Sequence, residues 1–174
     1  MSEDKELVQQ AIKGSNEAFL ELMQIYKIDL YKTALSYLRN QNEALEAVQE
    51  VTFRAYRKIH TVRNASFFKT WLIRIMINYC NDQLRKKKHL VFDDETIQRR
   101  GVSDNLENIE LEDAIMGLDD RSREVLTLKY FHDLKIKDIA VAMKCPEGTV
   151  KTWLNKALKA LRDMLDDKEG NHHV

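Results

Sequence analysis

Apolar residues recur at steps of three and four positions along most of the chain. Between residues 16 and 38 the positions that follow this spacing are Phe19, Leu20, Met23, Leu30, Tyr31, Ala34, Leu35 and Leu38. Such a repeat forms one face of an amphipathic helix. Gly14 ends a shorter helix before it, so the chain is predicted to begin with two helices.

Two further helices are predicted before residue 88. The apolar side of the third helix consists of Leu45, Val48, Thr52, Tyr56 and Ile59. Residues 60–65 are mostly polar and break the pattern, and Ser66 is suited to cap a fourth helix. The inner face of that helix is predicted to contain Phe68, Trp71, Leu72, Ile75 and Tyr79. Residues 1–88 can therefore enclose one core.

The helical spacing is lost after residue 88 and returns near residue 109. Residues 93–120 contain ten acidic side chains against Arg99 and Arg100. We therefore predict three segments, a flexible acidic linker over 89–108, a second helical domain over 109–168 and a tail over 169–174. In the second domain, Asp119 or Asp120 is expected to cap a helix.

The composition favours an all-α fold with two small helical domains. The 174 residues include five Gly and one Pro, too few turn formers for the many short strands of a sandwich or barrel. Lys plus Arg and Asp plus Glu number 28 each, so the formal net charge is zero. A polyanion such as DNA would therefore have to bind a local surface that is positively charged. Residues 1–10 have neither the basic end nor the apolar stretch of a secretory signal, and no apolar run reaches the roughly 20 residues of a membrane span. We expect a cytoplasmic protein without direct membrane insertion.

No pattern in the sequence points to catalysis. Cys80 and Cys145 are isolated, without the spacing of a zinc site. No carboxylate pair, triad or glycine-rich phosphate loop stands out. We therefore predict no catalytic residues, no metal and no cofactor, and a protein that is not an enzyme.

The segment from Asp133 to Leu165 has the layout of a helix-turn-helix. A short helix is predicted around Ile136 to Met143, then a turn at Lys144 and Cys145, then a long helix opened by Pro146. The buried stripe of the long helix is Val150, Leu154, Ala157, Leu158, Leu161 and Leu165.

The opposite side of the long helix carries positive charge and hydrogen-bonding groups. Its residues are Lys151, Thr152, Asn155, Lys156, Lys159 and Arg162. Lys and Arg neutralise phosphates, and Asn and Thr can read base edges in a major groove. An isolated basic helix is more often a solvated surface, but the short helix and tight turn before this one favour DNA binding.

A second polar stripe is predicted on the fourth helix, opposite Trp71 and Ile75. Its residues recur at steps of four, three and four, and they are Arg74, Asn78, Asn81 and Arg85. This pattern is less specific, because such residues also simply solvate helices. The loop of residues 60–67 places polar groups beside aromatic residues, which suits the holding of an unstacked base, although such loops are usually connectors. Two surfaces on separate domains would let the chain hold two DNA segments.

The order of these parts resembles the bacterial extracytoplasmic-function (group IV) RNA polymerase sigma factors. The most specific elements are AVQEVTFRAY, SFFKTWLIRI and EGTVKTWL, which stand in the order and at the separations of that family. The resemblance covers nearly the whole chain. It implies a dissociable subunit that binds RNA polymerase core, directs it to specific promoters and assists promoter melting, in a stress or envelope response.

The resemblance also implies roles for individual residues. The helix that binds the clamp helices of the polymerase core would present Glu46, Gln49, Glu50, Phe53 and Arg54. The minus-ten promoter surface would comprise Arg63, Asn64, Ala65, Arg74, Asn78, Asn81 and Arg85. The minus-thirty-five surface, on a domain that also sits on the polymerase flap, would comprise Thr149, Lys151, Thr152, Asn155, Lys156 and Lys159. An anti-sigma factor, often membrane-anchored, would cover the polymerase-binding surfaces.

The sequence departs from the common family pattern at several positions. Glu46 stands where many relatives have Asp, and it keeps the charge. Trp153 stands where many have Arg, and Leu158 stands at another position that is often basic, so the phosphate contacts are expected either to be reduced or to move to Lys156 and Lys159. Lys144 replaces a frequent turn glycine, and with a positive φ it would store a modest backbone strain.

Two other functions fit parts of the pattern. A stand-alone helix-turn-helix transcriptional regulator would bind a two-fold repeated site as a dimer and would shift DNA without polymerase. A helical adaptor would sequester a partner through residues 43–57, but this function leaves the helix-turn-helix unexplained.

The free protein is expected to bind promoter DNA poorly, because its formal net charge is zero.

Overall fold

The computed structural model describes residues 2–93 and 106–170, and the side chains of residues 4–90 and 110–170. Every regular element within these ranges is helical. The chain divides into two compact units, Met1–Gly101 and Val102–Val174. The predicted all-α fold with two small domains is therefore confirmed. The middle of the predicted linker and residues 171–174 of the predicted tail lie outside the described residues.

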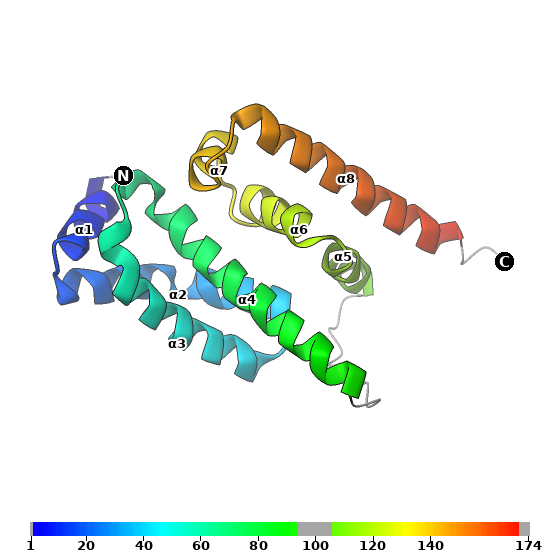
Figure 1. Cartoon of the computed structure of the whole chain (residues 1–174), viewed down its shortest axis with the longest axis horizontal. Helices are drawn as coiled ribbons and strands as arrows, with labels where there is room; N and C mark the ends of the chain where they lie inside the picture. The colour runs from blue at the N-terminus through cyan, green and yellow to red at the C-terminus, as the bar shows by residue number, and fades with distance from the viewer. Residues whose placement is uncertain (1, 94–105, 171–174) are drawn as a thin grey trace. The chain divides into compact units, whose positions relative to one another are not determined.

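In the first unit, α2 packs against all the other α-helices described there (Figure 1). The elements are α1 (Ser2–Ile12), α2 (Asn16–Leu38), α3 (Gln41–Lys58), the 3₁₀ turns η1 (Ile59–Thr61) and η2 (Ala65–Phe67), and α4 (Phe68–Asp93). Helix α3 also packs against α4. Gly14, with a φ of 107°, makes the left-handed turn between α1 and α2, a conformation that side chains disfavour.

The inner face of α3 consists of small residues. Ala44, Ala47, Val51 and Ala55 are all 0% exposed. Leu45 and Tyr56, which the periodicity assigned to the core, are 54% and 49% exposed. That assignment is wrong because the small side chains let α3 approach its neighbours closely, and the larger apolar residues are left outside.

The buried side of α4 also differs from the prediction. The residues that face the core are Phe68, Leu72, Ile73, Met76, Ile77 and Cys80. Trp71, Ile75 and Tyr79 are only partly buried. By helical spacing, Trp71 and Ile75 lie on the same side of α4 as Asn78, so the prediction that they lie opposite the polar stripe is wrong. Apolar residues surround most of this helix, and periodicity alone therefore could not select the buried arc.

The two ends of α4 were also predicted differently. Ser66, the expected cap, lies inside η2, and its backbone N–H donates to Oδ1 of Asn64 at 2.9 Å. At the other end, α4 continues to Asp93 and the next helix begins at Leu106. The first and last residues of the predicted linker are therefore helical.

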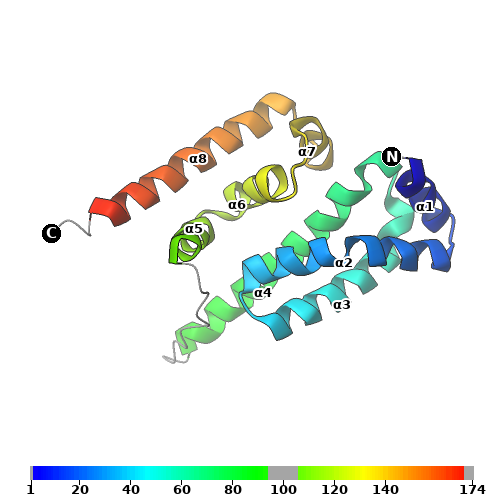
Figure 2. The same ribbon diagram turned by 180° about the vertical axis from the view of Figure 1, so that it is seen from behind.

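In the second unit, α5, α6 and α7 pack against α8 (Figure 2). The elements are α5 (Leu106–Met116), α6 (Asp120–Leu126), the π-helical turn η3 (Thr127–Phe131), α7 (Ile136–Ala142) and α8 (Glu147–Gly170). Of the two predicted cap residues, Asp119 and Asp120, Asp119 caps α6, because its Oδ1 accepts a hydrogen bond from the Ser122 N–H at 2.7 Å. Among the helices of the described ranges, none has the length and apolar character needed to cross a bilayer.

Candidate nucleic-acid and protein interfaces

Helices α7 and α8 form the helix-turn-helix that the sequence predicted. Lys144, in the turn between them, has a φ of 55°, so the positive φ that would strain this residue is present. Its N–H donates to the Val141 carbonyl at 3.2 Å, and the Cys145 N–H donates to the Ala140 carbonyl at 3.0 Å. These bonds close the C-terminal end of α7 and fix the entry into α8.

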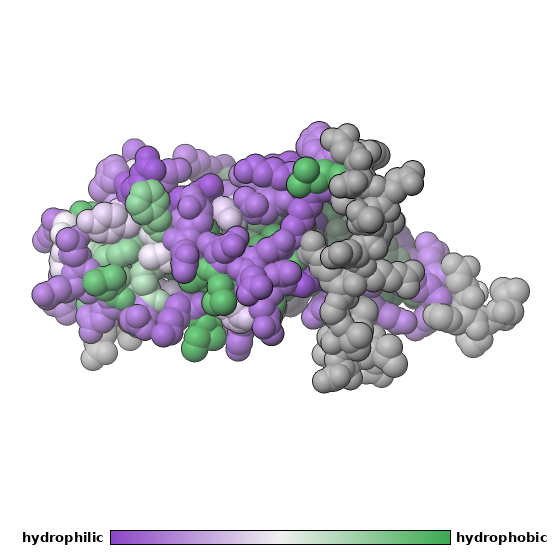
Figure 3. Space-filling view, turned by 90° about the horizontal axis from the view of Figure 1, so that it is seen from below, coloured by the Kyte–Doolittle hydropathy of each residue, from purple (hydrophilic) through white to green (hydrophobic). Residues whose placement is uncertain are grey.

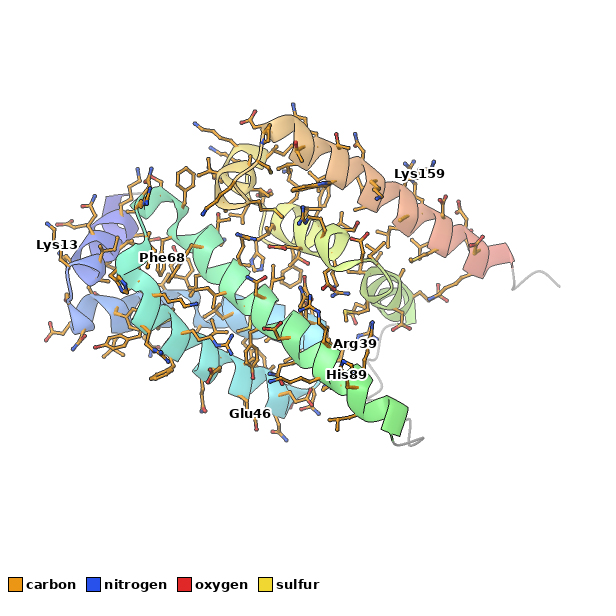
Figure 4. All side chains as sticks on the ribbon, viewed as in Figure 1. Lys13, Arg39, Glu46, Phe68, His89 and Lys159 are labelled. Carbon is orange, nitrogen blue, oxygen red and sulfur yellow. The ribbon has the colours of Figure 1, made fainter. Side chains whose placement is uncertain are left out.

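The outer face of α8 is open to solvent. Val150, Leu154 and Ala157 are buried. The predicted DNA-binding residues on the other side are exposed or, for Thr149, partly exposed, and they are Thr149, Lys151, Thr152, Asn155, Lys156 and Lys159. Figure 4 labels Lys159 on α8. The arrangement presents ammonium, amide and hydroxyl groups together on one helix, as readout of a major groove requires.

The polar stripe of α4 is exposed only in part. Asn78 and Arg85 are exposed and Arg74 is half-buried, but Asn81 is 6% exposed. The prediction that Asn81 lies on an open surface is wrong, because the buried arc of α4 extends as far as this residue. Arg85 Nη1 pairs with Asp82 Oδ1 at 3.0 Å.

The loop before α4 brings three predicted residues to the start of that helix. Arg63 and Asn64 are exposed and Ala65 is partly exposed. Phe68 is buried, with its ring centroid 5.6 Å from that of Tyr26 and 5.7 Å from that of Trp71. Trp71 and Tyr26 are therefore partly exposed members of a packed aromatic cluster, whereas Phe68 belongs to the core.

The outer face of α3 presents the predicted polymerase-binding residues. Glu46 (Figure 4), Gln49 and Phe53 are exposed. Arg54 Nε donates to Glu50 Oε1 at 3.1 Å, and the Arg54 guanidinium lies over the Tyr79 ring of α4, 5.1 Å from its centroid. Burial, and after it the charges of Glu50 and Glu46, raise the pKa of the Tyr79 hydroxyl. The face is acidic at Glu46 and apolar at Phe53.

Family comparisons match both units of the chain. The Sigma-70 region 2 family matches residues 22–90, and the Sigma-70, region 4 family matches residues 108–161. RNA polymerase sigma factor SigV of Bacillus subtilis is 37% identical over 147 residues, which cover 83% of this chain and 89% of SigV. ECF RNA polymerase sigma factor SigW of the same organism is 33% identical and covers 94% of this chain and 97% of SigW. The chain belongs to the ECF sigma factors of RNA polymerase.

Two solved structures resemble this sigma factor in fold. CnrH, solved in complex with the cytosolic domain of CnrY, gives a TM-score of 0.72 at 24% identity, with 94% of this chain and 97% of the CnrH chain covered. The sigma factor RpoE of Bartonella quintana was solved with the anti-sigma factor NepR. It gives a TM-score of 0.66 at 23% identity, with 85% of this chain and 96% of the RpoE chain covered. The likeness supports the fold of this sigma factor.

A shallow groove of about 390 Å³ lies beside the outer face of α3. It is lined by Asn16, Phe19, Leu20, Gln49, Thr52, Phe53 and Tyr56. Leu20 is 62% exposed, and hydrophobic patches interrupt the hydrophilic surface in Figure 3. The periodicity counted Leu20 and Tyr56 as core residues and therefore missed the groove. Only Phe53, a large apolar residue on a polar helix face, signals it in the sequence.

One side of α8 is covered by the start of α6. The Arg121 guanidinium lies over the Trp153 ring, with its Cζ 4.3 Å from the ring centroid. The hydrogen bond from the Ser122 backbone N–H lowers the pKa of the Asp119 carboxyl, and the charges of Lys156 and Arg121 lower it further. Trp153 therefore packs against a cation of another helix.

Proposed function

We propose that this sigma factor reads promoter DNA through α8 and α4 and binds RNA polymerase core through α3. The observation that carries the proposal is the two-sided character of α8. Val150, Leu154 and Ala157 fix the helix against its unit, and this leaves the polar face unobstructed within the unit. A face of that composition after a helix-turn-helix turn suits the minus-thirty-five element.

Roles within α8 follow from side-chain chemistry. We assign Lys151 and Lys159 to phosphates, because ammonium groups act as point charges. Thr152, Asn155 and Lys156 are assigned to base edges, since their tips can donate to or accept from groups in the major groove. Thr149 lies at the edge of the same surface.

The minus-ten surface is proposed to lie on the loop before α4 and on the exposed part of α4. Its residues are Arg63, Asn64, Ala65, Arg74, Asn78 and Arg85, and buried Asn81 is left out. Holding a flipped base and a separated strand offsets an unpairing cost of about a few kcal/mol per nucleotide. Strand opening then needs binding energy and no catalytic residue, so we propose a subunit without enzymatic activity.

Polymerase core is proposed to contact α3 and the adjoining groove. The carboxylates of Glu46 and Glu50 can pair with basic groups of the clamp helices, and such pairs set orientation and association rate. Phe53, Leu20 and Tyr56 offer apolar area that a partner can desolvate. The second unit is proposed to sit on the polymerase flap. Such a subunit acts where the polymerase is, in the cytoplasm.

An anti-sigma factor is proposed as a further partner. CnrH was solved with the cytosolic domain of CnrY and RpoE with the anti-sigma factor NepR. By analogy, an anti-sigma factor, soluble or membrane-anchored, would inhibit this chain by covering the α3 face and its groove.

Run-off transcription with purified core polymerase and a promoter library tests the proposal. We expect start sites that depend on this protein. Asn155→Ala should impair upstream-element recognition, Asn78→Ala should impair opening, and Glu46→Lys should weaken core binding. The control Lys13→Gln changes an exposed residue outside the three surfaces (Figure 4) and should behave as wild type. Normal transcription by all three test variants would refute the residue assignments.

A DNA-binding measurement without polymerase separates this function from that of a stand-alone regulator. We expect weak binding of the free protein to promoter DNA and tight binding of the holoenzyme, because two weak sites act together when the core fixes their separation. Tight binding of a two-fold repeated site by the free protein would favour the regulator.

A further inference from the structure

We propose that Arg121, at the start of α6, is an additional contact to the DNA backbone beside the minus-thirty-five surface, and that Trp153 holds it in position. The inference rests on the proposed function, because it requires α8 to bind the promoter. The role follows from how α6 and α8 meet.

Trp153 belongs to one flank of α8. Thr149 lies four residues before it and Lys156 three residues after it, and residues with this spacing lie on the same side of a helix. Both neighbours are among the residues that we assign to the minus-thirty-five surface. The Trp153 ring is partly exposed, and the Arg121 guanidinium covers it at 4.3 Å. The guanidinium is therefore fixed over a flank that borders the DNA-binding face.

The stacking has the geometry of a stabilising cation–π contact. A cation within about 6 Å of a tryptophan ring centroid gains roughly 0.5–1 kcal/mol at an exposed site. A guanidinium that stacks through its flat face keeps its in-plane N–H groups directed outward. Trp153 can therefore restrict the Arg121 side chain through a contact that requires no hydrogen-bond acceptor.

The acidic groups near Arg121 are already engaged. Oδ1 of Asp119 accepts from the Ser122 N–H at 2.7 Å, and Oδ1 of Asp120 pairs with Nη2 of Arg123 at 2.9 Å. Arg121 is exposed and forms no close ion pair with the side chains that the structure describes. A phosphate would therefore meet a positioned guanidinium whose acidic neighbour, Asp119, already accepts a hydrogen bond from the Ser122 N–H.

Lys156 reinforces the positive charge at this place. Lys156 and Arg121 both lie near enough to Asp119 to act on its carboxyl group, so the two cations share one region between α6 and α8. Arginine binds phosphate oxygens through two parallel N–H groups, which gives orientation as well as charge. The positive charge on this flank thus comes partly from α6, although Trp153 itself carries none.

Salt-dependent promoter binding by the reconstituted holoenzyme tests this proposal. For Arg121→Gln we expect a roughly threefold to tenfold loss of affinity, similar for all promoter sequences, and a slope of log K against log salt that is smaller by about one. Arg121→Lys should keep the slope. Trp153→Leu should weaken binding as Arg121→Gln does, and the double variant should be no worse than either single one.

A matched control and a stability measurement complete the design. Lys168→Gln removes an exposed charge 15 residues after Trp153 on α8, about 22 Å along the helix. This variant should change neither the affinity for promoter DNA nor the salt slope. If Arg121→Gln changes neither the affinity nor the salt slope, the proposal is overturned. It is also overturned if Arg121→Gln lowers the affinity and the melting temperature but leaves the salt slope unchanged, because the loss would then come from reduced stability. If Asn155→Ala and Lys159→Gln weaken binding while Arg121→Gln does not, only this inference fails. If none of the three does, the proposed role of α8 fails as well.

Discussion

Lys87 of α4 forms an ion pair with Glu43 in the first turn of α3. The two residues are 44 positions apart in the chain, so the pair joins the C-terminal half of α4 to the start of α3. It also uses, within the first unit, one of the charges in the basic run of residues 85–88. The net charge of that run overstates what is available to DNA.

The Lys87–Glu43 pair is expected to contribute little to stability. Both side chains are partly exposed, and exposed pairs typically contribute about 0.2–1 kcal/mol. A double-mutant cycle with Lys87→Met and Glu43→Gln, followed by urea unfolding, should give a coupling energy of that size that falls in high salt. A coupling energy of several kcal/mol would show that the pair is an essential part of the fold.

The Asp119 cap is expected to stabilise the second unit by about 1 kcal/mol, the usual loss when such a residue becomes alanine. Asp119→Ala should lower the free energy of unfolding by this amount, whereas Asp119→Asn should keep the cap, because asparagine caps equally well. Chemical unfolding of the two variants checks this difference. Equal losses of unfolding free energy in Asp119→Ala and Asp119→Asn would show that the charge of Asp119, and not its capping hydrogen bond, provides the stabilisation.

The same residue gives a pH dependence with a defined sign. The folded-state pKa of Asp119 is lowered from 3.8, so the unfolded chain binds the proton more readily. The stabilisation is fully present above pH 3.8 and is lost as the pH falls through the lower folded-state value. Asp119→Asn should therefore lose less stability on acidification than the wild type. Identical acid unfolding curves would contradict the assignment.

The alanine face of α3 is expected to tolerate no larger residue. Ala47 is 0% exposed, so Ala47→Leu would force helices apart and should cost about 1–3 kcal/mol or more. Leu45→Ala, on the exposed side of the same helix, should change stability by less than about 0.5 kcal/mol. Thermal or urea unfolding of both variants measures the two changes in stability. A larger effect at Leu45 than at Ala47 would mean that the buried face is misassigned.

The groove beside α3 is expected to contribute to polymerase binding. Leu20→Ser should weaken the affinity for core polymerase by about fivefold or more, since truncation of a central contact typically costs over about 1 kcal/mol. Ile28→Ser is the matched control, because Ile28 is also exposed on α2 but does not line the groove. Fluorescence titration with purified core measures both. Equal affinities for the two variants would remove the groove from the interface.

Several features of this protein were determined by the sequence alone. The helix-turn-helix, the Asp119 cap and the polar face of α8 were predicted correctly, because each rests on local chemistry. A carboxylate can cap a helix wherever the backbone turns there, and a stripe of Lys, Asn and Thr opposite Val150 and Leu154 can face only solvent or a polar partner.

The tertiary structure decided which apolar residues are inside. Helices α3 and α4 carry apolar residues around much of their circumference, and burial then depends on how closely the neighbouring helix approaches. The alanines of α3 allow the neighbouring helices to approach closely, so Leu45 and Tyr56 are left outside the core. Asn81 is buried because it lies on the arc of α4 that faces the neighbouring helices. The contact between Arg121 and Trp153 likewise joins residues 32 positions apart, and no local pattern encodes it. Such contacts depend on the packing of whole helices, which the spacing of residues along one helix does not specify.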